Sequence, residues 1–92
     1  MNLTTRIESI ARADRYARAG ERHLKTGRID LAIHRFGRAA TACESADLGG
    51  LAKTYWLRLA ELCDSVGDVE RAAAGREIAA KIEVYDPEED GQ

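Results

Sequence analysis

Apolar and small residues recur along this chain with the period of an α-helix. In the first third of the chain, the residues that share one arc at about 100° per residue are Leu3, Ile7, Ile10, Ala13, Ala17, Gly20 and Leu24. The opposite arc carries the basic residues Arg12, Arg15, Arg18 and Arg22. No segment alternates apolar and polar residues over the length of a β-strand. The pattern therefore predicts an all-α protein.

Glycines divide the chain into four segments of helical length, because glycine commonly marks the end of a helix. The glycines that do so are Gly27, Gly49, Gly50 and Gly67. The first helix is predicted to open with a capping box, Thr5-x-x-Glu8, and to run to about residue 26. The second helix is predicted at about residues 29–45 and the fourth at about 69–85. The third is predicted to begin somewhere between residues 47 and 51 and to end near residue 66.

The last stretch of the chain differs in composition from the rest. It is acidic, it holds the only proline, Pro87, and it has no apolar face to bury. Residues 1–86 are therefore expected to form a single helical domain, and residues 87–92 a disordered acidic C-terminal tail.

The chain also matches itself when it is shifted by 40 residues. The aligned pairs are Tyr16 and Trp56, Arg18 and Arg58, Glu21 and Glu61, Gly27 and Gly67, Ile29 and Val69, Ala32 and Ala72, Ala39 and Ala79, and Ala40 and Ala80. These pairs occur in both predicted helices of each half. The match therefore indicates two copies of one helix-turn-helix unit, arranged as two antiparallel helical hairpins.

The spacing within each copy resembles the tetratricopeptide repeat. The matching residues of the first copy are Tyr16, Ala19, Gly20, His23, Gly27, Ala32, Phe36 and Ala39, and those of the second are Trp56, Leu59, Ala60, Cys63, Gly67, Ala72, Arg76 and Ala79. The small residues Gly20 and Ala60 are expected where the two helices of a hairpin cross. The family repeats every ~34 residues, so the longer period would place about six extra residues in the connection at 46–51. Trafficking-type three-helix modules share part of this spacing, and kinship with them is open.

The resemblance implies a concave groove that binds peptides. The groove residues would be Ala17, Glu21 and Leu24 from the first helix, and Leu57, Glu61 and Asp64 from the third. Leu57 stands out because the residues around it on that face are polar, although single exposed leucines are common. The three acidic side chains of this set favour a basic or amphipathic partner segment.

The fourth predicted helix has a second apolar stripe, formed by Ile78, Ile82 and Tyr85. One helix of a two-hairpin protein cannot bury both of its stripes against the third helix. The second stripe is therefore a candidate interface, and it leads us to expect a homodimer. The alternative is that the 46–51 connection or the tail covers it.

The arginines of the first helix allow three interpretations. They occupy the face that has no preceding hairpin to pack on, so they fit the polar surface of a terminal capping repeat. They can also contact a nucleic-acid backbone or an acidic protein. We expect the solvated cap and keep a nucleic-acid-associated regulator as the alternative function.

Residues with catalytic or metal-binding spacing are missing from the sequence. There is no nucleophile–base pair, no phosphate-binding glycine loop and no ligand cluster, so we expect no enzyme, no catalytic residue, no cofactor and no metal. The two cysteines, Cys43 and Cys63, are too far apart in sequence for a metal motif and are expected to be small buried apolar residues. The chain has no membrane-length apolar run and does not start like a signal peptide, so a cytoplasmic location is expected.

Together these observations predict a small protein–protein interaction module. Such a module would act as an adaptor or regulatory protein that binds or sequesters another protein or peptide. The sequence does not name that partner.

Overall fold

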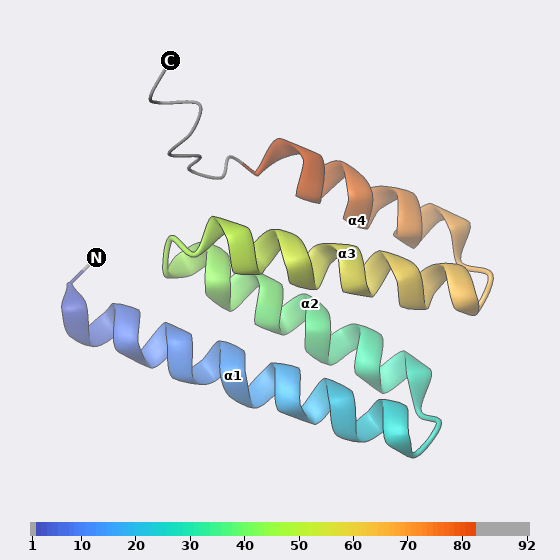
Figure 1. The fold of residues 1–92 in the computed structure, drawn as a ribbon, viewed down its shortest axis with the longest axis horizontal. Helices are drawn as coiled ribbons and strands as arrows, with labels where there is room; N and C mark the ends of the chain where they lie inside the picture. The colour runs from blue at the N-terminus through green and yellow to red at the C-terminus, as the bar shows by residue number, and fades with distance from the viewer. Residues whose placement is uncertain (1, 83–92) are drawn as a thin grey trace.

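The computed structural model describes residues 2–82 and contains four α-helices in this part of the chain. They are α1 (Leu3–Lys25), α2 (Ile29–Ser45), α3 (Gly49–Ser65) and α4 (Val69–Lys81). Each helix runs antiparallel to the next and packs against it (Figure 1). The predicted all-α fold with two helical hairpins is confirmed, while the predicted tail at 87–92 lies outside the described residues.

The first helix begins earlier than predicted. Asn2 is its N-cap, because the Asn2 side-chain oxygen accepts a hydrogen bond from the Thr5 amide at 2.8 Å. The predicted capping box of Thr5 and Glu8 is therefore wrong, and both of these residues lie within the first turns of α1. Asparagine is among the residues that cap a helix N-terminus best. Because Asn2 precedes Thr5, the helix begins directly after Asn2.

The three connections between the helices share one geometry. Each has three residues, and the middle one adopts a positive φ: 74° at Gly27, 58° at Asp47 and 79° at Gly67. In each connection the amide after this residue bonds back to a carbonyl of the preceding helix at 2.8–2.9 Å. This is the hydrogen-bonding pattern of a helix C-terminus closed by a left-handed residue.

The second connection is consequently as short as the other two. The extra residues expected at 46–51 are not in a loop, so that expectation is wrong; they lengthen α2 and α3, which have 17 residues each. The turns at 27, 47 and 67 place equivalent positions 20 residues apart, half of the period found in the sequence. The fully buried alanines Ala32, Ala52 and Ala72 follow this 20-residue period and allow each helix to approach its predecessor.

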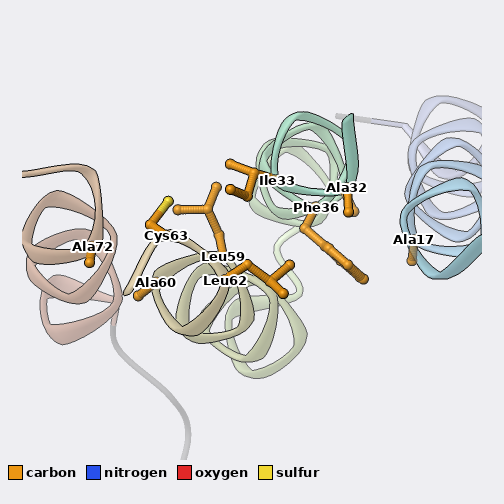
Figure 2. Packing of buried hydrophobic residues seen from close by; sticks show 10 residues of the cluster. Ala17, Ala32, Ile33, Phe36, Leu59, Ala60, Leu62, Cys63 and Ala72 are labelled. Carbon is orange, nitrogen blue, oxygen red and sulfur yellow. The ribbon is translucent and has the colours of Figure 1, made fainter. Parts of the chain in front are cut away.

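The main hydrophobic cluster is centred on Phe36. Its ring points from α2 into the space between α1 and α3, while Leu59 and Leu62 extend from α3 on its other side (Figure 2). Gly20 on α1 faces the ring so closely that a Cβ there would lie 2.9 Å from a ring carbon. The small residue expected at this crossing is thus explained by the ring it accommodates.

A second, smaller cluster lies at the end of the molecule where α1 and α3 begin. Its buried members are Ala13, Ala42, Cys43 and Ala52, and its partly buried neighbours are Leu48, Tyr55 and Ile82. Cys43 and Cys63 are both free and fully buried, which confirms the interpretation from sequence. Burial raises the pKa of both thiols, so the neutral form is favoured in the folded protein.

The fourth helix is shorter than predicted. It ends at Lys81, and Ile82 has extended backbone angles, φ −80° and ψ 121°. The predicted helix to residue 85 is therefore wrong at Ile82, and Tyr85 lies outside the described residues. Ile82 leaves the helix and packs against the second cluster, so its apolar side chain is partly buried within the chain.

The first turns of α1 extend past the end of α2. The Arg6 side chain bonds the Ala46 carbonyl at 3.0 Å, which marks the level at which α2 stops. Near this end of α1, Leu3, Ile7 and Ile10 remain 73%, 55% and 41% exposed. The apolar arc predicted for the first helix is thus buried at Ala13, Ala17 and Gly20 and partly buried at Leu24.

Packing at Gly20 leads to a stability prediction. We expect Gly20→Ala to lower the free energy of unfolding, because overpacking costs about 1–3 kcal/mol and alanine regains only ~1 kcal/mol in helix propensity. The control is Gly37→Ala, where the new Cβ meets only a Leu59 methyl group at 3.2 Å. Urea denaturation of both variants measures the difference, and equal stabilities would contradict the role of the Phe36 ring.

The shared turn geometry leads to a second prediction. Gly67→Ala should lower the free energy of unfolding by about 1–2 kcal/mol, because an L-residue is strained at positive φ. No atom lies within 4 Å of the added Cβ, so the backbone alone is tested. Asp47→Gly should have the opposite effect, with a gain of up to ~1 kcal/mol. Thermal unfolding followed by circular dichroism measures both, and an unchanged Gly67→Ala would refute the argument.

Candidate protein-binding site

A cleft of about 410 Å³ lies between α1 and α3. Both helices pack against α2, but no Cα atom of α1 is within 8 Å of one in α3. The residues that line the cleft are Ala17, Arg18, Glu21, Arg22 and Lys25 of α1, Phe36 of α2 and Tyr55 of α3. We call this feature the α1–α3 cleft.

Two aromatic rings form the apolar part of the cleft. The ring centroids of Phe36 and Tyr55 are 6.1 Å apart and the ring planes are tilted by 30°. Burial raises the pKa of Tyr55, and it is raised further by Cys43, where the thiol ionises, and by the negative charges of Asp14 and Glu21. The hydroxyl therefore stays protonated at neutral pH and can donate a hydrogen bond beside an apolar surface.

The acidic side chains near the cleft are paired within the chain. Arg58 lies over the Phe36 ring, 5.8 Å from its centroid, and its guanidinium group is 3.8 Å from Glu21 and 3.4 Å from Glu61. Arg58 thus places one positive charge beside two carboxylates while it covers the ring, so it offsets part of their negative charge. Asp64 is paired in turn with Arg76 of α4.

The basic side chains of the lining are less fully paired. Arg18 bonds Asp14 at 2.9 Å, but within residues 2–82 neither Arg22 nor Lys25 has an acidic partner within 4 Å. Three basic residues and one acidic residue line the cleft. The lining of this cleft is therefore mainly basic, because Glu61 and Asp64 lie outside it. The acidic groove stays a prediction for the face of α3 that carries these two residues.

The structure brings together only part of the predicted groove. Ala17 and Glu21 line the cleft, and Leu24 is half-buried against the main cluster. The α3 residues Leu57, Glu61 and Asp64 do not line the cleft. They are exposed on α3, and only Glu61 is linked to it, through Arg58.

Sequence reasoning missed the residues with which α3 faces the cleft, Tyr55 and Arg58. Tyr55 packs against both hydrophobic clusters and also lines the cleft. An aromatic residue of this kind reads as core in the sequence unless the separation of α1 and α3 is known. Arg58 aligns with Arg18 in the repeat, and both prove to be close to the cleft.

Exposed apolar residues extend the cleft toward the start of α1. Ile10 precedes Glu21, and Ile7 precedes Arg18, by 11 residues, which is about three helical turns, so these residues share the cleft side of α1. On α3, Leu51 precedes Tyr55 by one turn and is also exposed. We call Leu3, Ile7, Ile10 and Leu51 the apolar end of the cleft.

The residues predicted for a homodimer interface do not form one helical stripe in the structure. Ile78 is exposed on α4, Ile82 is half-buried beside Asp47 and Gly49, and Tyr85 is outside the described residues. Partial cover by the 46–51 connection, the alternative noted from sequence, is thus observed for Ile82. The homodimer stays a prediction.

The arginines of α1 do not face one direction. Arg18 and Arg22 line the cleft, whereas Arg12 lines a separate hollow between α1 and α2 together with Arg38. Among residues 2–82, no group of three or more histidine, cysteine or acidic side chains is placed to hold a metal ion. None of the four helices is long and apolar enough to span a bilayer.

Comparison with known proteins gives no relative. No protein-family model, curated protein or solved structure matches this chain. The function is therefore inferred from the residues of the cleft.

The contrast between Leu57 and Leu62 leads to a prediction. Leu57 is 43% exposed and Leu62 is 8% exposed, although both are leucines of α3. Leu57→Asp should change the free energy of unfolding by less than ~0.5 kcal/mol, while Leu62→Asp should lower it by more than about 3 kcal/mol. Urea denaturation measures both changes. If Leu57→Asp also unfolds the protein, the outer face of α3 is not a free surface.

Proposed function

We propose that this protein is a protein–protein interaction module that binds a segment of another protein in the α1–α3 cleft. The observation that carries the proposal is the combination, in one cleft, of the partly exposed Tyr55 ring with Arg22 and Lys25, which lack acidic partners in the described chain. This combination favours a segment with an apolar side chain next to acidic residues.

The apolar and the charged residues of the cleft would contribute differently to binding: the apolar residues chiefly to affinity, and the charged residues chiefly to specificity. An apolar side chain placed against the partly exposed Tyr55 ring would be removed from water, and aromatic residues are typical anchors of protein interfaces. The Phe36 ring is buried beneath and supports this surface. Acidic side chains beside it would meet Arg22 and Lys25 at the rim, where charges chiefly select the partner and speed its association. The sequence suggested a basic or amphipathic partner, and the lining of the cleft favours an acidic and amphipathic one.

Other expectations from sequence belong to the same proposal. They are an adaptor or regulatory role without enzymatic activity, a cytoplasmic location, a two-repeat tetratricopeptide-like origin, and a homodimer in which Ile78 takes part. The three-residue turns and buried small residues of the fold support the repeat interpretation. Nucleic-acid binding is the alternative, but the divergence of Arg12 from Arg18 and Arg22 provides no continuous basic track for it.

The proposal predicts which charges matter for binding. The probes are fluorescein-labelled peptides that carry one tryptophan or leucine flanked by glutamates. Arg22→Gln combined with Lys25→Gln should weaken their binding about tenfold, which corresponds to ~1.4 kcal/mol. Fluorescence anisotropy measures the affinity at low and at high salt, and the effect should shrink as salt screens the charges.

Two comparisons make this experiment decisive. The matched control is Arg12→Gln combined with Arg15→Gln, which removes the same charge from the same helix without touching the cleft lining. Equal weakening by both double variants would show a non-specific charge effect and contradict the cleft. If lysine-flanked peptides bound more tightly than glutamate-flanked ones, and if Leu57→Asp weakened their binding, the binding site would lie on the outer face of α3 instead of in the cleft. Tight binding of oligothymidine instead of the peptides would favour the nucleic-acid alternative.

A further inference from the structure

The hollow between α1 and α2 differs in chemistry from the α1–α3 cleft. Its volume is about 330 Å³. The residues that line it are Arg12 and Tyr16 of α1 and Arg38, Thr41, Ala42 and Ser45 of α2. None of these residues lines the cleft, so the two features are separate. We call this feature the α1–α2 hollow.

Close packing of small residues places two arginines at the rim of the hollow. Ala13 and Ala42 belong to the second cluster and are 2% and 6% exposed, so α1 and α2 approach each other closely here. Arg12 directly precedes Ala13, and Arg38 lies one turn before Ala42 on α2. Both arginines are exposed. Two guanidinium groups from different helices therefore border one hollow.

The positive charge of the hollow has no counter-charge in residues 2–82. Neither arginine of the lining has an acidic partner within 4 Å there. Asp14 and Glu44 are close to the lining along the chain, but both are hydrogen-bonded elsewhere. Asp14 accepts from Arg18 at 2.9 Å, and Glu44 accepts from the Trp56 indole at 3.3 Å. The hollow is thus open to an anion from outside.

A third arginine adds to the positive charge of this region. Arg35 precedes Arg38 by three residues on α2, a spacing that makes the two side chains neighbours on the helix. Among the described residues, the Arg35 Nε atom is buried without a hydrogen-bond partner. A buried donor of this kind is uncommon in folded proteins. The positive potential around the hollow is therefore larger than its own lining provides.

The hydroxyl groups of the lining differ in what they can offer to a ligand. Thr41 donates to the Arg38 carbonyl at 3.0 Å, and Ser45 donates to the Thr41 carbonyl at 3.1 Å. These two protons are therefore used within α2. Tyr16 adds a phenol hydroxyl, which can donate. The donors that a ligand would meet are two guanidinium groups and one phenol.

A phosphate group fits these donors better than a carboxylate does. Each guanidinium group donates two parallel hydrogen bonds to a pair of oxygens. A terminal phosphate has three acceptor oxygens and a charge of about −1.5 to −2 at neutral pH, so it can serve both guanidinium groups at once. A carboxylate has only two oxygens and one negative charge. A phosphodiester of nucleic acid also carries a single negative charge.

We infer that the α1–α2 hollow binds a dianionic phosphate group through the guanidinium groups of Arg12 and Arg38 and the hydroxyl of Tyr16. Free phosphate and the phosphorylated side chain of another protein both present this group. The site does not depend on the α1–α3 cleft, and it gives the protein a second ligand next to the proposed peptide.

Titration of the full-length protein with sodium phosphate tests this inference. Sodium chloride keeps the ionic strength constant, and nuclear magnetic resonance follows the side-chain Nε–H signals of Arg12 and Arg38. Both signals should shift in a saturable manner. Arg12→Gln and Arg38→Gln should each lower the phosphate affinity at least about tenfold, which corresponds to ~1.4 kcal/mol. Arg38→Lys keeps the charge but not the paired donors, so it should still lower the affinity at least about threefold.

Matched variants show whether the effect belongs to the hollow. Arg15→Gln combined with Arg28→Gln removes two exposed arginines outside the lining and should leave the phosphate affinity unchanged. Tyr16→Phe should lower it about threefold through the lost hydrogen bond. The arginines changed are all exposed, so thermal unfolding should stay the same. The absence of saturable shifts, or equal weakening by the Arg15 and Arg28 variant, would overturn the inference.

Other probes identify the source of the phosphate and its chemistry. The first is a phosphoserine peptide beside the same peptide with serine. If the phosphopeptide binds at least about tenfold more tightly than inorganic phosphate and Arg38→Gln weakens it, the ligand is a phosphorylated partner. If inorganic phosphate binds as tightly as the phosphopeptide, the ligand is free phosphate. Both results support the site. Acetate or dimethyl phosphate that bound as tightly as inorganic phosphate would refute a site for a dianion.

Discussion

The ring of Phe36 is the contact on which the site depends. It fits against α1 only because Gly20 has no Cβ, and it fills the space that separates α1 from α3. Since those two helices do not approach each other directly, a cleft remains above the ring. The guanidinium group of Arg58 lies over the same ring, so one side chain both packs between three helices and supports the positive charge next to Glu21 and Glu61.

Much of the fold could be predicted from sequence because it depends on local preferences. Helical periodicity gave the four helices, and Gly27 and Gly67 gave two turns, because glycine adopts a positive φ without strain. Asp47 takes the same conformation without being glycine, so the middle turn was expected to be longer than it is. The end of α4 at Lys81 was missed because Ile82 gains more from the second cluster than from another helical residue.

The site could be predicted only in its α1 half, at Ala17 and Glu21. Whether Tyr55 belongs to the core or to the wall of the cleft depends on the distance between α1 and α3. The Phe36 ring sets this distance, and the hydrophobic periodicity of the sequence does not indicate it. The net charge of the cleft was also out of reach. It depends on which charged residues line the cleft: Arg18, Arg22 and Lys25 do, whereas Asp64 does not, and this follows from the packing of the helices.

The serial packing of the helices has a consequence for how the protein unfolds. Among the described helices, each brings its backbone close only to its neighbours in sequence, although the Arg58–Glu21 ion pair links α1 with α3. The free energy of the fold is therefore close to a sum of single-helix and adjacent-pair contributions. α4 has 13 residues and one neighbour, against which it buries only Ala72, Gly75 and Ala79. Small residues bury little apolar area, so α4 is held less firmly than α1, the other helix with a single neighbour. α4 is therefore the unit that opens first in native-state fluctuations, and α1, α2 and α3 keep the cleft intact when it does.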